Sequence, residues 1–168
     1  KKNIKFCNNI TRFKISFFLR FLNTFLSLVK LGPLQNGYFY SKEMFNFINN
    51  SKDNYDTIIF HLIRCAQYLP SDFKGKTILE MTDLVSVRDK QIIKGLSIIN
   101  PLRYLYILEN FLMKKYEIKV SNKFDKVVFI SKKELFQAKK FIEKNKIVVI
   151  ENNFNIEKKI YNFNKKNK

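Results

Sequence analysis

The chain has 168 residues, and its 32 Lys and Arg against 14 Asp and Glu give a formal net charge of +18. Hydrophobic residues make up 46% of the sequence and aromatic residues 15%, which excludes a disordered basic tail because so many large apolar side chains would not stay in water. The length suits one domain with its own core, and the low counts of 4 Gly and 3 Pro exclude fibrous and low-complexity proteins.

Residues 13–31 form the first predicted element, an amphipathic helix with an apolar stripe opposite a polar one. The apolar stripe contains Ile15, Phe18, Leu19, Leu22, Phe25, Leu26 and Val29, and the polar stripe contains Ser16, Arg20, Asn23, Ser27 and Lys30. The charges make this segment too polar to span a bilayer, which takes about 20 nearly uncharged residues. Two interpretations follow: the helix packs on a sheet, or it lies on a membrane surface.

The rest of the chain alternates between short apolar runs and helical patterns. Runs rich in β-branched and aromatic residues predict buried strands at 55–63, 77–82, 127–130 and 147–150. Helices are predicted at 41–50, 64–69, 101–124 and 132–144, with Ser41 and Ser131 as N-caps and Glu134 closing a capping box. Residues 37–40 are compatible with a further strand, and residues 83–88 with a loop. This order predicts an α/β fold with a Rossmann-like, mostly parallel sheet flanked by helices.

The carboxyl ends of the predicted strands are where an open parallel sheet binds ligands. Asp83, Ser86 and Arg88 follow the second strand and offer a carboxylate, a hydroxyl and a fixed cation. Such a set could orient a hydroxylated acceptor, with Asp83 accepting its proton. In the alternative interpretation, Asp83 only caps the next segment and Arg88 is solvated.

Two further candidates follow the first predicted strand. His61 is the only histidine, and at a strand end it is either a site residue or a hydrogen-bonded structural one. Arg64, near Tyr68, could face a phosphate or an internal carboxylate.

The positive charge comes mostly from lysine, since only five residues are Arg. Proteins that read nucleic acid rely on Arg for bidentate contacts, so the scattered lysines favour a composition bias over a nucleic-acid site. The electrostatic field of the net positive charge would nevertheless attract anionic lipids or phosphates. The two cysteines, Cys7 and Cys65, are too few for a disulfide scaffold and indicate a reducing compartment.

Several stretches occur in an order and spacing that point to one family. They are Tyr55–Arg64 with Tyr68-Leu69, Ile78–Ser86 with its aspartate-x-x-serine, Glu109 and Glu117, Asp125–Ser131, and Ile147–Asn153. Together they make the segment from Asn36 to Asn155 resemble the N-terminal, acceptor-side domain of family-4-type glycosyltransferases of GT-B architecture. Glu109 and Glu117 also have the spacing of the family's donor-binding glutamate pair. Because that pair belongs to the family's second domain, we interpret this match as coincidence.

The resemblance implies a domain at residues 1–155 that lacks the family's first strand, followed by a basic tail at 156–168 at the start of an interdomain linker. It also implies transfer of a sugar from a nucleotide-sugar donor to an acceptor hydroxyl. Asp83 is then the candidate base, and Ser86, Arg88, Arg64 and His61 would bind the acceptor. The donor would be held mainly by a second domain outside these residues, without a metal or cofactor, so this chain would be inactive alone.

The implied partners are an acceptor glycan or lipid-linked sugar, in the synthesis of cell-surface polysaccharide or glycolipid, and no nucleic acid. The implied location is the cytoplasm, with peripheral contact to the inner face of the membrane through residues 13–31. The alternative is a non-catalytic basic α/β module that binds anionic membrane or nucleic acid through its lysines.

Overall fold

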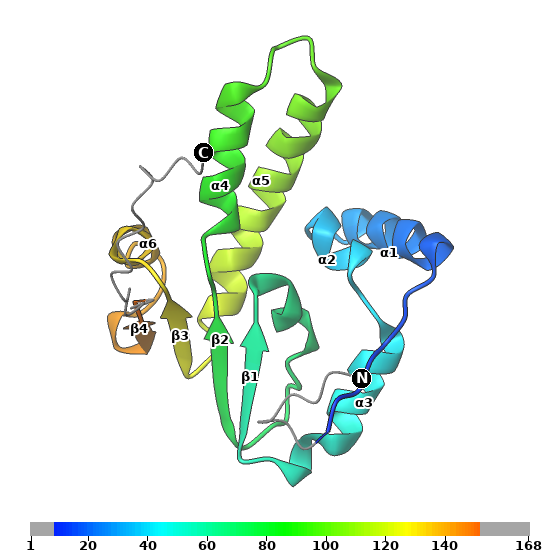
Figure 1. Cartoon of the computed structure of the whole chain (residues 1–168), viewed down its shortest axis with the longest axis vertical. Helices are drawn as coiled ribbons and strands as arrows, with labels where there is room; N and C mark the ends of the chain where they lie inside the picture. Colours follow the sequence, from blue (N-terminus) through cyan, green and yellow to red (C-terminus); the bar gives the residue numbers. More distant parts are fainter. Residues whose placement is uncertain (1–8, 152–168) are drawn as a thin grey trace, which may run out of the picture.

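Four parallel strands form the centre of the fold in a computed structural model that describes residues 9–151 (Figure 1). The strands are β1 (Thr57–His61), β2 (Lys76–Glu80), β3 (Lys126–Phe129) and β4 (Ile147–Val149), and they lie in the order β1-β2-β3-β4. All three neighbouring pairs are parallel. The predicted α/β, Rossmann-like fold is therefore confirmed, and the strands occur where the apolar runs predict them, with shifted ends.

Helical segments make each connection between consecutive strands. The short 3-10 segment η2 (Ile63–Tyr68) joins β1 to β2, and α4 (Val85–Gly95) and α5 (Pro101–Ser121) join β2 to β3. The last connection contains α6 (Lys132–Ala138) and η3 (Lys144–Lys146). Figure 1 shows that α4 continues beyond the carboxyl end of β2 and that α5 returns beside it, so the two helices form a projecting hairpin.

The core lies on one face of the sheet. Phe60, Leu79 and Val127 occupy neighbouring register positions on β1, β2 and β3, and all three are buried. Met113 of α5 and Phe124, which follows α5, belong to the same cluster. In the order β1-β2-β3-β4, each strand is added next to the preceding one, and each crossover is expected to be right-handed. All connections then lie on the same face of the sheet, which explains why the core forms on that face.

The opposite face of the sheet is open to solvent at β1. Ile59 is 64% exposed, and the His61 side chain is exposed as well. The prediction of a buried strand at 55–63 is therefore wrong for this face, because β1 alternates and only Phe60 of its five residues is buried.

Three helices precede the sheet: α1 (Phe17–Val29), α2 (Leu34–Tyr38) and α3 (Lys42–Ser51), with η1 (Lys52–Asn54) after them. The prediction of a possible strand at 37–40 is wrong, because helix α2 extends to Tyr38 and therefore includes the start of this stretch. Gly37 is buried against α1, where an added Cβ would lie 2.3 Å from the Asn23 carbonyl oxygen. This glycine therefore allows two helices to approach closely.

Helix α1 presents its apolar stripe to solvent and its polar stripe to the protein. Phe18, Phe25 and Val29 are 75%, 62% and 66% exposed, and no residue of α1 is buried. On the other side, Asn23 donates to the Tyr40 carbonyl and Ser27 to the Pro33 carbonyl. The predicted stripes are present, but the interpretation that the helix packs on the sheet is wrong, since α1 packs against α2.

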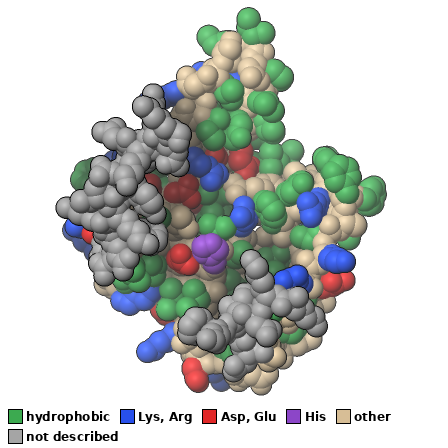
Figure 2. All heavy atoms as spheres, in the orientation of Figure 1, with side chains coloured by type: hydrophobic (Ala, Val, Ile, Leu, Met, Phe, Trp, Pro, Cys, Tyr) green, Lys and Arg blue, Asp and Glu red, His purple; other side chains and the backbone are tan. Residues whose placement is uncertain are grey.

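Large apolar surfaces are consequently exposed at two places. Figure 2 shows hydrophobic side chains gathered over α1 and at the far end of the α4–α5 hairpin. At that end, Ile98 and Ile99 are 71% and 92% exposed. Among residues 9–151, no helix combines the length and apolar character needed to cross a bilayer.

Candidate functional site

The carboxyl ends of β1 and β2 border a small hollow that contains several of the predicted site residues. It has a volume of about 80 Å³, and we call it the edge hollow. Its polar lining consists of Gln35, Arg64, Thr82, Asp83 and Arg88, and its apolar lining of Leu62, Ile63 and Val85. Parallel strands thus bring Arg64, Asp83 and Arg88 together, as expected for an edge at which strand ends meet.

Asp83 and Arg88 form an ion pair in this hollow. A carboxylate oxygen of Asp83 lies 3.6 Å from Nη1 of Arg88, and both side chains keep a third or more of their surface exposed. Nη2 of Arg88 lies 3.4 Å from the carboxylate of Asp89, which is almost fully buried. The guanidinium is therefore anchored by a buried partner, and Asp83 remains accessible to a ligand.

Arg64 enters the hollow from η2 and is held by an aromatic ring. Its guanidinium carbon lies 4.4 Å from the centre of the Phe39 ring, within the range of a cation–π contact. Among the residues described, no carboxylate lies within ion-pair distance of Arg64, so the internal carboxylate considered from the sequence is not found there. Its charge remains accessible to an anionic or hydroxyl-bearing ligand.

The backbone that positions Arg64 is strained at Leu62. This residue has φ 69° and ψ 145°, a backbone conformation that residues other than glycine rarely adopt. Its N–H donates to the Glu80 carbonyl oxygen at 2.9 Å, which fixes the turn immediately after β1. A conformation of this kind costs on the order of 1–3 kcal/mol and is concentrated at functional sites.

Ser86 does not join the hollow, because residues 83–88 are not the loop that the sequence predicts. Helix α4 begins at Val85, and Ser86 is buried in its first turn. The Ser86 N–H and hydroxyl both donate to the carboxylate of Glu117 on α5. Burial raises the pKa of Glu117 to about 7.

The start of α4 is fixed by carboxylates that lie far away in the sequence. Leu84 in the N-cap position provides no side-chain hydrogen bond. Instead Glu117 accepts from Ser86, and Glu134 of α6 accepts from the Leu84 N–H at 3.1 Å. Glu134 therefore binds another helix terminus, while Ser131 caps its own helix by accepting from Lys133.

His61 lies outside the edge hollow. Its ring Nδ1 is 2.9 Å from a carboxylate oxygen of Glu80, its register partner on β2, and the pair is on the open face of the sheet. The structure therefore brings His61 to a different surface from Asp83.

A larger cavity of about 490 Å³ adjoins the hollow and shares Gln35 and Arg88 with it. We call it the helix cavity, because its lining comes from the helices α1, α2, α4 and α5. Its polar lining is Thr24, Gln35, Arg88, Asp89 and Glu109, and its apolar and aromatic lining is Leu34, Tyr38, Leu102, Leu105 and Tyr106.

Gln35 and Asp89 are two site residues that sequence reasoning missed. Gln35 is placed by Glu109, whose carboxylate accepts from the backbone N–H groups of Leu34 and Gln35 and from the Gln35 side-chain amide. Asp89 is 1% exposed, burial raises its pKa, and its Oδ2 has no hydrogen-bond partner among residues 9–151. No local signal in the sequence marks Asp89, because the helix that carries it is not predicted there.

The residues described contain no group of three His, Cys, Asp or Glu side chains placed to hold a metal ion. Comparison of the chain with models of protein families, with curated proteins and with solved structures finds no match.

Proposed function

We propose that this chain is the acceptor-side domain of a glycosyltransferase, which holds the hydroxyl that receives a sugar. The observation that carries the proposal is the meeting of Arg64, Asp83 and Arg88 at the carboxyl edge of a parallel sheet. The resemblance of residues 36–155 to the acceptor-side domain of family-4-type glycosyltransferases adds to it.

The helix cavity has the chemistry that a sugar ring needs. Arg88, Asp89 and Glu109 offer planar charged groups that can pair with hydroxyls, and Tyr38 and Tyr106 offer aromatic surface for the apolar face of a ring. The edge hollow alone is too small for a sugar, but the two spaces share Gln35 and Arg88 and together can hold one beside Asp83.

In the proposed reaction, Asp83 accepts the proton of the acceptor hydroxyl. The acceptor oxygen bonds to the anomeric carbon of the donor sugar, and the nucleoside diphosphate leaves with the electrons of the broken bond. Arg88 holds the Asp83 carboxylate in place, and Arg64 and Gln35 orient the acceptor. The nucleotide-sugar donor is held mainly by a second domain outside this chain.

The proposal includes a contact between the membrane and the exposed apolar stripe of α1. A glycan or lipid-linked acceptor for surface polysaccharide or glycolipid would be met at the cytoplasmic face of the membrane. The outward apolar stripe of α1 would then enter the headgroup region there.

The test of the proposed base is Asp83→Asn in the full-length enzyme that contains this domain. We expect turnover to fall by about 100-fold or more, the range of a general base, with the melting temperature unchanged. Asp53→Asn is the matched control, since it removes the same charge from an exposed position in η1. A loss of less than about threefold, or an equal loss in the control, would remove Asp83 from this role.

The second candidate is a non-catalytic α/β module that binds anionic membrane. It is favoured by the excess of basic residues, most of which form no ion pair among the residues described. A sugar-transfer assay on the full-length protein distinguishes the two candidates, because a non-catalytic module would transfer no sugar.

A further inference from the structure

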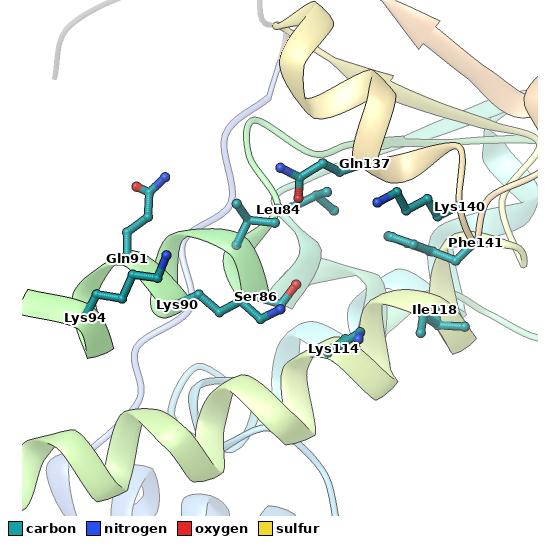
Figure 3. A pocket seen from close by; sticks show the side chains of 11 residues that line it. Leu84, Ser86, Lys90, Gln91, Lys94, Lys114, Ile118, Gln137, Lys140 and Phe141 are labelled. Atoms are coloured by element: carbon teal, nitrogen blue, oxygen red, sulfur yellow. The ribbon is translucent and has the colours of Figure 1, made fainter.

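A further cavity, separate from the proposed acceptor site, lies among α4, α5 and α6 (Figure 3). Its volume is about 560 Å³, and we call it the lysine pocket. Four lysines line it: Lys90 and Lys94 from α4, Lys114 from α5, and Lys140 just after α6. Four cations thus come together from three separate parts of the chain.

The positive charge of the lysine pocket is not balanced by the protein residues described. Within residues 9–151, none of the four lysines forms an ion pair, and no Asp or Glu lines the pocket. Lys90 and Lys94 are one helical turn apart, where like charges repel each other. A cluster of this kind is stabilised by an anion that several ammonium groups can share.

A carboxylate that lies behind the pocket wall, that of Glu117, is already engaged. Glu117 lies beneath Ser86, is fully buried, and accepts both hydrogen bonds that Ser86 donates. The neutral lining adds the amide groups of Gln91 and Gln137, which can donate to a further oxygen. Figure 3 shows these amides on opposite sides of the pocket, from α4 and α6.

The size and the number of cations indicate more than one phosphate. Each lysine is a point charge with three donors, so four lysines together match several phosphate oxygens. The walls also include Leu84, Ile118 and Phe141, which make the pocket a concave small-molecule site with an apolar side.

From these observations we infer that the lysine pocket binds a small molecule through a diphosphate group. This binding site is separate from the edge hollow and does not depend on sugar transfer.

The test measures binding of inorganic pyrophosphate and of orthophosphate to the full chain by calorimetry at physiological ionic strength. Salt at that level screens exposed charges beyond about 8 Å, so that contacts within the pocket dominate. The pocket variant carries Lys90→Gln, Lys94→Gln, Lys114→Gln and Lys140→Gln. The control variant carries Lys42→Gln, Lys74→Gln, Lys123→Gln and Lys133→Gln, all of which are exposed and outside the pocket.

Both variants lose four positive charges, so the general attraction of the protein for anions falls equally in the two. We expect the pocket variant to bind pyrophosphate about tenfold more weakly than the wild type or worse, and the control to change by less than about twofold. We also expect the wild type to bind pyrophosphate at least about tenfold more tightly than orthophosphate. Equal losses in the two variants, or equal affinities for the two anions, would overturn the proposal. Circular dichroism checks that each variant is folded, and we expect both to be folded because all the replaced side chains are exposed.

Discussion

Glu117 has an environment that makes the stability of the protein depend on pH. Its side chain is fully buried, and burial raises its pKa from 4.5 to about 7. The folded state therefore binds a proton at this residue more tightly than the unfolded state does. The resulting stabilisation is fully present below about pH 4.5 and is lost as the pH rises through about 7.

We predict that Glu117→Gln removes this pH dependence. A glutamine keeps the shape, accepts from the Ser86 N–H and can donate to the Ser86 hydroxyl oxygen, but it does not ionise. In the wild type, the free energy of unfolding should fall by about 3 kcal/mol between about pH 4.5 and 8 because of this group. Urea denaturation at several pH values measures the slope for each protein. A variant with the same slope as the wild type would show that another group carries the effect.

The residues of the edge hollow show what the sequence could predict of the site. Asp83 and Arg64 follow two adjacent parallel strands, and the carboxyl ends of such strands meet at one edge whatever the details of packing. The sequence predicts Ser86 in a loop, whereas the structure places it on helix α4, where its hydroxyl donates to Glu117. Gln35 is brought to the hollow by contacts with Glu109 that leave no pattern in either local sequence.

At the scale of the element, local pattern predicts the strands and most helices, since their apolar periodicity is a property of the segment itself. Helix α4 was missed because its first N–H groups are bound by Glu117 and Glu134, and no local cap marks its start. The stripes of α1 were predicted correctly, but periodicity does not state which side faces the protein. That choice is made by Gly37 and by the polar contacts of Asn23 and Ser27.

The orientation of α1 predicts an unusual tolerance of polar substitutions. Phe18 and Phe25 both lie on its outward stripe, so Phe18→Ser with Phe25→Ser removes little buried surface. We expect the free energy of unfolding to change by less than about 0.5 kcal/mol, as for surface positions in general. Phe124→Ala is the contrasting variant, because Phe124 is buried against Phe60, and its loss should cost about 3–5 kcal/mol. Urea denaturation would contradict this placement of α1 if the two sets of changes cost similar amounts.

At the scale of the whole molecule, exposed apolar surface and net positive charge occur together. The two surfaces at α1 and at the end of the α4–α5 hairpin differ in their setting. Helix α1 carries a long outward apolar stripe with the exposed Lys30 at its end, whereas Arg20 is turned toward the protein and donates to the Tyr38 hydroxyl. An exposed apolar stripe on a helix in a strongly basic protein is suited to an anionic bilayer surface. The far end of the hairpin, with Ile98 and Ile99, is a turn and not an amphipathic helix.

This difference predicts which surface contacts a membrane. We expect the full chain to bind vesicles of phosphatidylcholine with phosphatidylglycerol, and to bind them more weakly without the anionic lipid or at high salt, because the lysine attraction is screened. Phe18→Ser with Phe25→Ser should weaken binding by about tenfold or more, since each apolar side chain contributes through buried area. Ile98→Ser with Ile99→Ser is the matched control, because it removes two strongly exposed apolar side chains from the other surface and should change binding by less than about threefold. Vesicle co-sedimentation measures all three proteins. If the two variants lost vesicle binding equally, exposed apolar residues would promote binding wherever they lie on the protein. Helix α1 would then not be the membrane contact.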